Sequence, residues 1–143
     1  IELLVFFFFF QTTAIAGSVL LGIIADSIGQ KKTIMITLVM WLITVLIAFL
    51  VQDKNGFYVV GLIAGAAMGS SQSTSRSMMS KLTPPEFFGF YSFFGKSSAV
   101  FGPLVFGLVS FISGDQRLAI ISIAFFFIVG FLIVTRVKDP DYA

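Results

Sequence analysis

The chain has 143 residues, of which 57% are hydrophobic and only 11% are charged. Soluble domains carry about 25% charged residues, so this composition excludes an ordinary soluble domain and favours a protein that has the lipid bilayer as its solvent. The formal net charge of +2 is too small to indicate a nucleic-acid partner. The sequence contains neither Cys nor His, which removes thiolate metal sites, disulfides and the commonest general base.

Five apolar stretches follow one another along the chain, separated by short polar breaks. They cover residues 3–25, 33–51, 57–80, 87–112 and 118–135. A helix needs roughly 20 residues to cross the hydrocarbon core, and each stretch is long enough. The breaks combine Gly or Pro with charged residues, as helix ends do. We therefore predict an all-α integral membrane protein with about five transmembrane helices in residues 1–143.

The distribution of basic residues predicts the orientation of these helices. The first and third breaks and the C-terminal tail share one side and hold Lys31, Lys32, Lys81, Arg136 and Lys138. The other side holds only Lys54 and Arg117. Because cytoplasmic loops carry the excess of Lys and Arg, we expect the C-terminus in the cytoplasm and Ile1 outside.

The chain begins at Ile1 rather than Met and opens directly into an apolar run. Transporters are usually built from paired, pseudo-symmetric sets of helices. An odd number of spans therefore leads us to expect further helices before Ile1.

The first break, GIIADSIGQKKT at 22–33, joins the first two spans. Its candidate functional residues are Gly22, Asp26, Gly29, Lys31 and Lys32. The glycines permit close approach and a tight turn, and the acidic residue should lie at a helix end. The simplest interpretation is a short loop with cytoplasmic charges. The spacing also resembles the loop motif of the major facilitator superfamily, which implies a gating loop that braces neighbouring helices.

The serine-rich tract GSSQSTSRSMMSK at 69–81 follows an apolar run with no turn signal between them. A helical projection places on one face Gly61, Gly65, Gly69, Gln72, Ser73, Arg76 and Ser80. The glycines form a small-xxx-small pattern that lets another helix approach closely. Since serine can bond to the carbonyl of the preceding turn, we predict that the tract is helical. Gln72 and Arg76 are then candidate substrate or pathway contacts; alternatively, the tract has reached the headgroups and Arg76 snorkels.

The stretch 87–112 separates small and polar residues from aromatic ones. One face of the predicted helix carries Gly89, Ser92, Lys96, Pro103, Gly107 and Ser110, and the opposite face carries Phe87, Phe90, Phe94 and Phe101. Lys96 lies roughly 14 Å along this helix, near the midplane, where an ionisable side chain is costly. Lys96 and Ser92 are therefore candidate pathway contacts; the alternative is a structural lysine that snorkels or binds carbonyls freed by Pro103. Pro103 should kink the helix and, with Gly107, form a hinge or packing site.

The segment QSTSRSMMSKLTPPEFFGFYSFFGKSSAVFGPLVFG at 72–107 resembles one branch of the major facilitator superfamily, the autophagy-related vacuolar effluxers and their bacterial relatives. The shared features are Q-S-x-S-R-S, L-x-P, E-F-F-G-x-Y, G-K and G-P. The resemblance covers the chain as helices eight to twelve of a twelve-helix fold. It implies a secondary active transporter of small solutes that works by alternating access. In the fungal members, the implied activity is export of amino acids from the vacuole.

From this resemblance we expect a small-molecule substrate, the bilayer and the missing N-terminal half of the transporter as partners. The implied location is the inner membrane of a bacterium or the vacuolar membrane of a fungus. No nucleotide-binding glycine loop, nucleophile elbow or metal cluster occurs, so we expect neither an enzyme nor a cofactor. The competing function is a non-transporting membrane scaffold, in which the glycine stripes serve only helix association.

Overall fold

The computed structural model describes residues 1–139, which fold into five long helices and one short 3₁₀ turn. The elements are α1 (Glu2–Ile28), α2 (Gln30–Leu50), α3 (Lys54–Leu82), η1 (Pro85–Phe87), α4 (Phe88–Ser113) and α5 (Gln116–Arg136). No strand occurs in this part of the chain. Four helical segments are long and apolar enough to cross a membrane, namely α1, α2, η1 with α4, and α5. The predicted all-helical membrane class is confirmed.

α3 falls outside that set of four because its second half is the serine-rich tract. This tract is helical, as predicted, and continues α3 without interruption. The hydroxyls of Ser71 and Ser80 donate to the carbonyl oxygens of Met68 and Ser77 at 3.0 and 2.8 Å. Serine side chains bonded to the preceding turn in this way leave the helical ladder intact. The polar composition therefore marks a polar helix rather than a linker.

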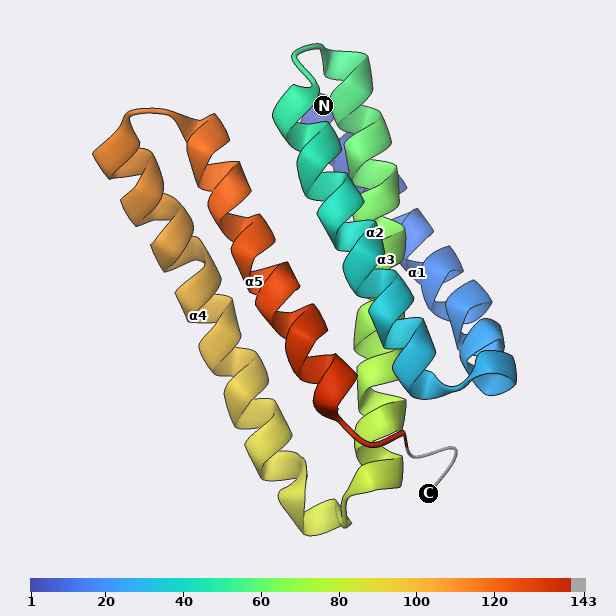
Figure 1. The fold of residues 1–143 in the computed structure, drawn as a ribbon. Helices are drawn as coiled ribbons and strands as arrows, with labels where there is room; N and C mark the ends of the chain where they lie inside the picture. The colour runs from blue at the N-terminus through green and yellow to red at the C-terminus, as the bar shows by residue number, and fades with distance from the viewer. Residues whose placement is uncertain (140–143) are drawn as a thin grey trace.

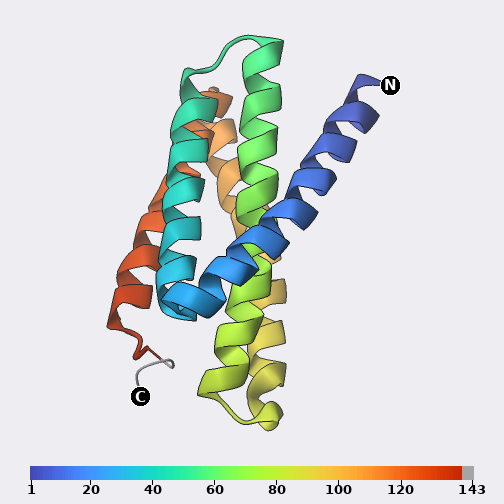
Figure 2. The ribbon, with the colours of Figure 1, turned by 90° about the vertical axis from the view of Figure 1, so that its right-hand side faces the viewer.

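The helices pack in the spatial order α1, α3, α2, α5, α4, so that α3 lies between α1 and α2 (Figure 1). α1 crosses α3 obliquely (Figure 2). Between α2 and α5, the rings of Trp41 and Phe127 stack with centroids 5.1 Å apart. α4 lies at the edge of the group and packs mainly against α5 (Figure 1).

The connections gather at the two ends of the helices. The α1–α2 turn, the α3–α4 connection and the end of α5 lie at one end, and the other two connections lie at the opposite end with the N-terminus (Figure 1). The basic residues of each predicted side of the membrane therefore share one end of the structure. Which end faces the cytoplasm stays a prediction.

The α1–α2 turn is shorter than the polar break in the sequence suggests. α1 continues to Ile28, α2 begins at Gln30, and only Gly29 separates them. Gly29 is buried and has a φ of 95°, a backbone conformation that residues with a Cβ rarely adopt. The turn thus depends on glycine at this position.

α2 and α5 run antiparallel, and each carries a cation near its start that binds the end of the other. The Lys31 Nζ donates to the carbonyl oxygens of Thr135 and Val137 at 3.0 and 2.7 Å. At the opposite end, the Arg117 guanidinium donates to the carbonyl oxygen of Phe49 at 3.4 Å. A cation is favourable beside a helix C-terminus, where carbonyl groups lack partners within the helix. These contacts hold α2 and α5 together at both ends.

Candidate functional site

Glycines of α3 let α1 and α3 cross at close range. The α3 glycines that face α1 are Gly61, Gly65 and Gly69. A Cβ at Gly65 would overlap the carbonyl oxygen of Phe10, and a Cβ at Gly69 would overlap that of Ala14. Small residues let two helix backbones approach at such distances. The sequence stripe therefore corresponds to the site where α1 packs.

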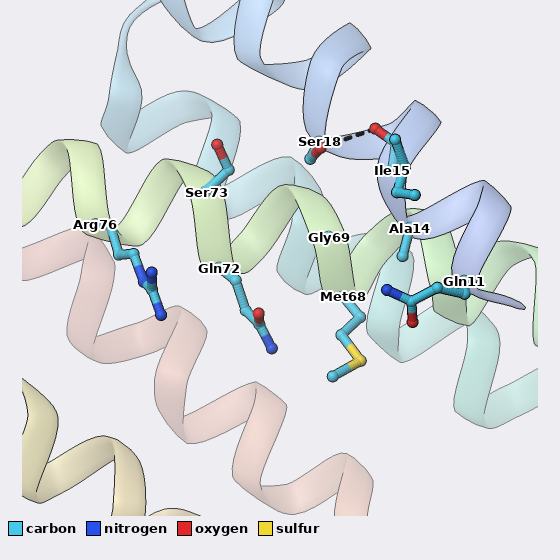
Figure 3. A pocket seen from close by; sticks show the side chains of 9 residues that line it. All are labelled: Gln11, Ala14, Ile15, Ser18, Met68, Gly69, Gln72, Ser73 and Arg76. Atoms are coloured by element: carbon cyan, nitrogen blue, oxygen red, sulfur yellow. Dashed lines mark hydrogen bonds between the residues drawn. The ribbon is translucent and has the colours of Figure 1, made fainter.

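A polar cavity of about 510 Å³ lies beside this crossing. Its lining residues are Gln11, Ala14, Ile15 and Ser18 of α1 and Met68, Gly69, Gln72, Ser73 and Arg76 of α3 (Figure 3). Met68, Gln72 and Arg76 extend from the same side of α3, because residues four apart lie one turn above each other (Figure 3). The close backbone approach brings Gln11 of α1 to the same cavity.

Among the described residues that line this cavity, only Arg76 carries a charge. Its guanidinium makes no ion pair with any residue in the described part of the chain. A guanidinium presents five donors in a planar fork that matches a carboxylate or a phosphate. The amides of Gln11 and Gln72 each add donor and acceptor groups. This combination can bind a small polar solute that carries an anionic group.

The cavity lining includes two of the four predicted pathway residues, Gln72 and Arg76, and the predicted packing residue Gly69. Gln11 and Ser18 of α1 were not predicted from the sequence. Ser18 is not a free donor, because its hydroxyl donates to the carbonyl oxygen of Ile15 at 2.8 Å (Figure 3). The available signal for Gln11 was the one amide in the uncharged span 3–25.

The other two predicted pathway residues, Ser92 and Lys96, lie on α4 and do not line this cavity. Both side chains are exposed, and Lys96 makes no hydrogen bond or ion pair with any of residues 1–139. The aromatic face opposite is also exposed, with Phe90 at 63% and Phe94 at 65%. The described residues therefore do not distinguish a lipid side from an interior side of α4, and the predicted role of Lys96 stays a prediction.

Pro103 lies within the uninterrupted helix α4 and lines an apolar groove between α4 and α5. Phe101, expected on the face opposite Pro103, lines the same groove with Phe106 and Phe127. A Cβ at Gly107 would meet no atom within 4 Å. The predicted hinge and packing roles of Pro103 and Gly107 therefore stay predictions.

The residues of the predicted gating loop take different positions around the α1–α2 turn. Lys31 braces α5, as described above, and Lys32 is exposed. A Cβ at Gly22 would meet no atom within 4 Å, whereas Gly29 forms the turn itself. Asp26 lines a second, smaller cavity. Lys31 thus connects α2 to the end of α5, and the gating role of the loop stays a prediction.

Comparison with known proteins finds a matching family model and several relatives. A family model described as "Vacuole effluxer Atg22 like" matches residues 1–140. An uncharacterized MFS-type transporter, YxiO of Bacillus subtilis, is 28% identical over 142 residues, which are 96% of this chain and 33% of that protein. Autophagy-related protein 22 of Pichia angusta is 31% identical over 113 residues, 68% of this chain and 20% of that protein.

Autophagy-related protein 22-1 of Aspergillus niger is 34% identical over 77 residues, 51% of this chain and 12% of that protein. The chain thus spans a third or less of the length of these curated relatives. No solved structure matches it. Because the family model covers nearly all of its length, the chain belongs to the vacuole effluxer Atg22-like family.

Proposed function

We propose that this chain forms part of a secondary active transporter that exports a small solute by alternating access. Membership in a family of vacuole effluxers supports the transport class and its direction. In such transporters, helical bundles rock around a site near the middle of the membrane. The oblique crossing of α1 and α3, with a polar cavity beside it, is a suitable place for such a site.

The observation that carries the proposal is the exposed Arg76 guanidinium, which has no acidic partner among residues 1–139 and lines a polar cavity. A carboxylate-bearing solute would supply that partner through a bidentate pair. The carbonyl oxygens of Gln11 and Gln72 could accept hydrogen bonds from an ammonium group on the same solute. An amino acid has both groups, so amino-acid efflux is the specific activity we propose.

The remaining predicted residues have supporting roles in this proposal. The gating loop around Asp26 and Lys31 controls the cytoplasmic mouth, with the C-terminus on the cytoplasmic side. Lys96 and Ser92 line the pathway on α4, and Pro103 provides the bend. Each of these roles follows from the sequence pattern and needs its own test.

A cysteine-labelling experiment tests the proposal directly. The 143 residues contain no Cys, so Gln72→Cys introduces the first thiol into this chain. In the full-length protein in sealed vesicles, a membrane-impermeant maleimide should label residue 72 only in the access state that opens toward the reagent. Amino acids should change the labelling rate, because the solute either covers the thiol or shifts the population of the two access states.

Ser80→Cys is the matched control, since Ser80 is exposed on the same helix but lies outside the cavity. Its labelling should not respond to the solute. A membrane scaffold, the competing function, predicts labelling at residue 72 that no amino acid changes. That result, together with no amino-acid flux from loaded vesicles, would reject the transport proposal.

A further inference from the structure

A second polar cavity, of about 220 Å³, lies where the α1–α2 turn meets α3. Its lining residues are Gly22, Ala25, Asp26, Gln30, Ser73, Thr74 and Ser77. Among the described residues of this lining, the polar groups are one carboxylate, three hydroxyls and one amide, and none is a Lys or Arg. The cavity is therefore rich in oxygen ligands and has a net negative charge.

One of these oxygens is buried and lacks a hydrogen-bond partner within residues 1–139. Thr74 is 2% exposed, and its Oγ1 has no hydrogen-bond partner in the described part of the chain. The other threonines that are buried to this degree bond to their own helix: Thr33, Thr37 and Thr44 donate to the carbonyls of Gly29, Ile34 and Met40. A buried hydroxyl without a partner is costly, so a ligand that accepts or donates a hydrogen bond here would stabilise Thr74, which has no partner within residues 1–139.

The carboxylate of this lining belongs to Asp26, whose side chain is exposed. Asp26 makes no ion pair within residues 1–139. Lys31 points to the end of α5, where it binds the carbonyls of Thr135 and Val137. Arg76 lines the neighbouring cavity and not this one. A cation bound here would therefore meet a carboxylate that is not already neutralised.

We propose that this cavity binds a small monovalent cation, with Na⁺ as the ligand to test. Hard cations take oxygen ligands, and divalent Ca²⁺ sites gather several carboxylates, whereas the described residues of this lining supply one. Asp26 supplies the balancing charge, and Thr74 and Ser77 supply neutral oxygens. The volume leaves room for several water molecules, each occupying about 30 Å³, to complete the coordination shell.

The position of this site suggests what it would do. Ser73 lines both this cavity and the larger α1–α3 cavity, so a bound cation would lie next to the proposed solute site. Binding of either ligand would then influence the other through the same turn of α3. The cation site goes beyond the proposed function, and it can be tested without any solute.

The test is thermal unfolding of the purified full-length protein in detergent, with no solute present. NaCl is titrated against N-methylglucamine chloride at constant ionic strength. A ligand that binds only the folded state raises the unfolding temperature with its concentration. We expect a rise with NaCl that follows a single-site binding curve, and none with N-methylglucamine chloride. Equal behaviour in the two salts, or stabilisation by MgCl₂ or CaCl₂ but not by NaCl, would overturn the proposal.

Two variants assign the effect to this cavity. Asp26→Asn removes the charge, and Thr74→Val removes the buried hydroxyl while keeping the side-chain shape. Each should weaken the apparent Na⁺ affinity about tenfold or more, because each removes an oxygen that contacts a charge. Thr74→Val is the variant to rely on if Asp26→Asn does not fold.

Thr37→Val is the matched control, because Thr37 is equally buried but its hydroxyl donates to Ile34 in α2 at 2.8 Å. It should leave the Na⁺ affinity unchanged. Unchanged affinity in Thr74→Val as well would mean that the cavity holds only water, and the proposal would fail. A Na⁺ effect in a protein that moves no amino acid would leave the cation site standing and reject only the transport proposal.

Discussion

Glycines of α3 and glycines of α4 have opposite surroundings. At Gly65 and Gly69 of α3, an added Cβ would collide with the backbone of α1. At Gly89, Gly102 and Gly107 of α4, an added Cβ would meet no atom within 4 Å. The same residue type thus marks a filled helix contact in one region and an uncovered helix face in the other.

This difference shows what a stripe of small residues can and cannot indicate. Small residues permit close helix packing, but the partner helix must be present for the contact to exist. α3 has α1 as its partner, and the polar side chains Gln72 and Arg76 lie beside that contact in a cavity. α4 carries Lys96 on a face that none of residues 1–139 covers.

The largest expected effect is the loss of transport in Arg76→Met. If the α1–α3 cavity binds the solute, this change removes the one positive charge that the described residues contribute to its lining. Hydrogen bonds to charged groups contribute about 1.5–3 kcal/mol, so the transport rate at low solute concentration should fall roughly tenfold to a hundredfold. Arg76→Lys keeps the charge without the planar fork and should retain partial activity. Flux of amino acids from loaded vesicles, at equal protein level, measures both.

Lys96→Met applies the same change to α4 and should lower transport about tenfold or more if Lys96 lines the pathway, with protein level unchanged. Methionine keeps much of the lysine stem, so packing is little altered. A lysine that only snorkels predicts the opposite result, because its removal relieves a desolvation cost. Flux at the wild-type rate would therefore remove Lys96 from the site and leave the α1–α3 cavity as the candidate.

Substituting glycines tests the packing difference itself. Gly69→Ala should lower the free energy of unfolding by about 1–3 kcal/mol, because the Cβ forces the backbones of α1 and α3 apart. Gly107→Ala in the same 143-residue chain should be neutral or stabilising by up to about 1 kcal/mol, since alanine favours helix and nothing obstructs it. Denaturant unfolding in detergent micelles, followed by circular dichroism, measures both. Equal effects of the two substitutions would remove the distinction between α3 and α4.

Much of the fold follows from the sequence. Apolar length predicted the helices, and the backbone bonding of serine predicted that the tract at 69–81 is helical. Gln72 and Arg76, predicted as pathway contacts, line the α1–α3 cavity, and their role stays a prediction. The α1 side of the cavity was not predicted, because Gln11 belongs to a span with little difference between its faces. Which helix fills a glycine stripe depends on tertiary packing, and no local pattern encodes it.

The attachment of α4 to the rest of the structure depends on α5, which Lys31 holds at one end. Lys31→Met should lower the free energy of unfolding by about 1 kcal/mol, because the last carbonyls of α5 lose their cation. Lys138→Met is the control: it removes a charge near the same end, but Lys138 makes no hydrogen bond with any described residue. Hydrogen exchange should show faster opening of the last turn of α5 only in Lys31→Met. Equal exchange in both variants would mean that the contact is not formed.

The smallest effect concerns the ion pair between Glu2 and Lys54, the first residues of α1 and α3. The hydrogen bond from Lys54 to the Glu2 carboxylate raises the pKa of Lys54 above its ordinary value of 10.5. The contribution to stability is therefore fully present below that ordinary value and is lost as the pH rises through the raised pKa. Because both side chains are exposed, the contribution is small and should weaken further in high salt.

Glu2→Gln should thus lower the unfolding temperature slightly at neutral pH and low salt. The difference between this variant and the wild type should vanish when the pH exceeds the raised pKa of Lys54. A drop as large as that of Gly69→Ala would show that the ion pair, and not glycine packing, holds α1 against α3.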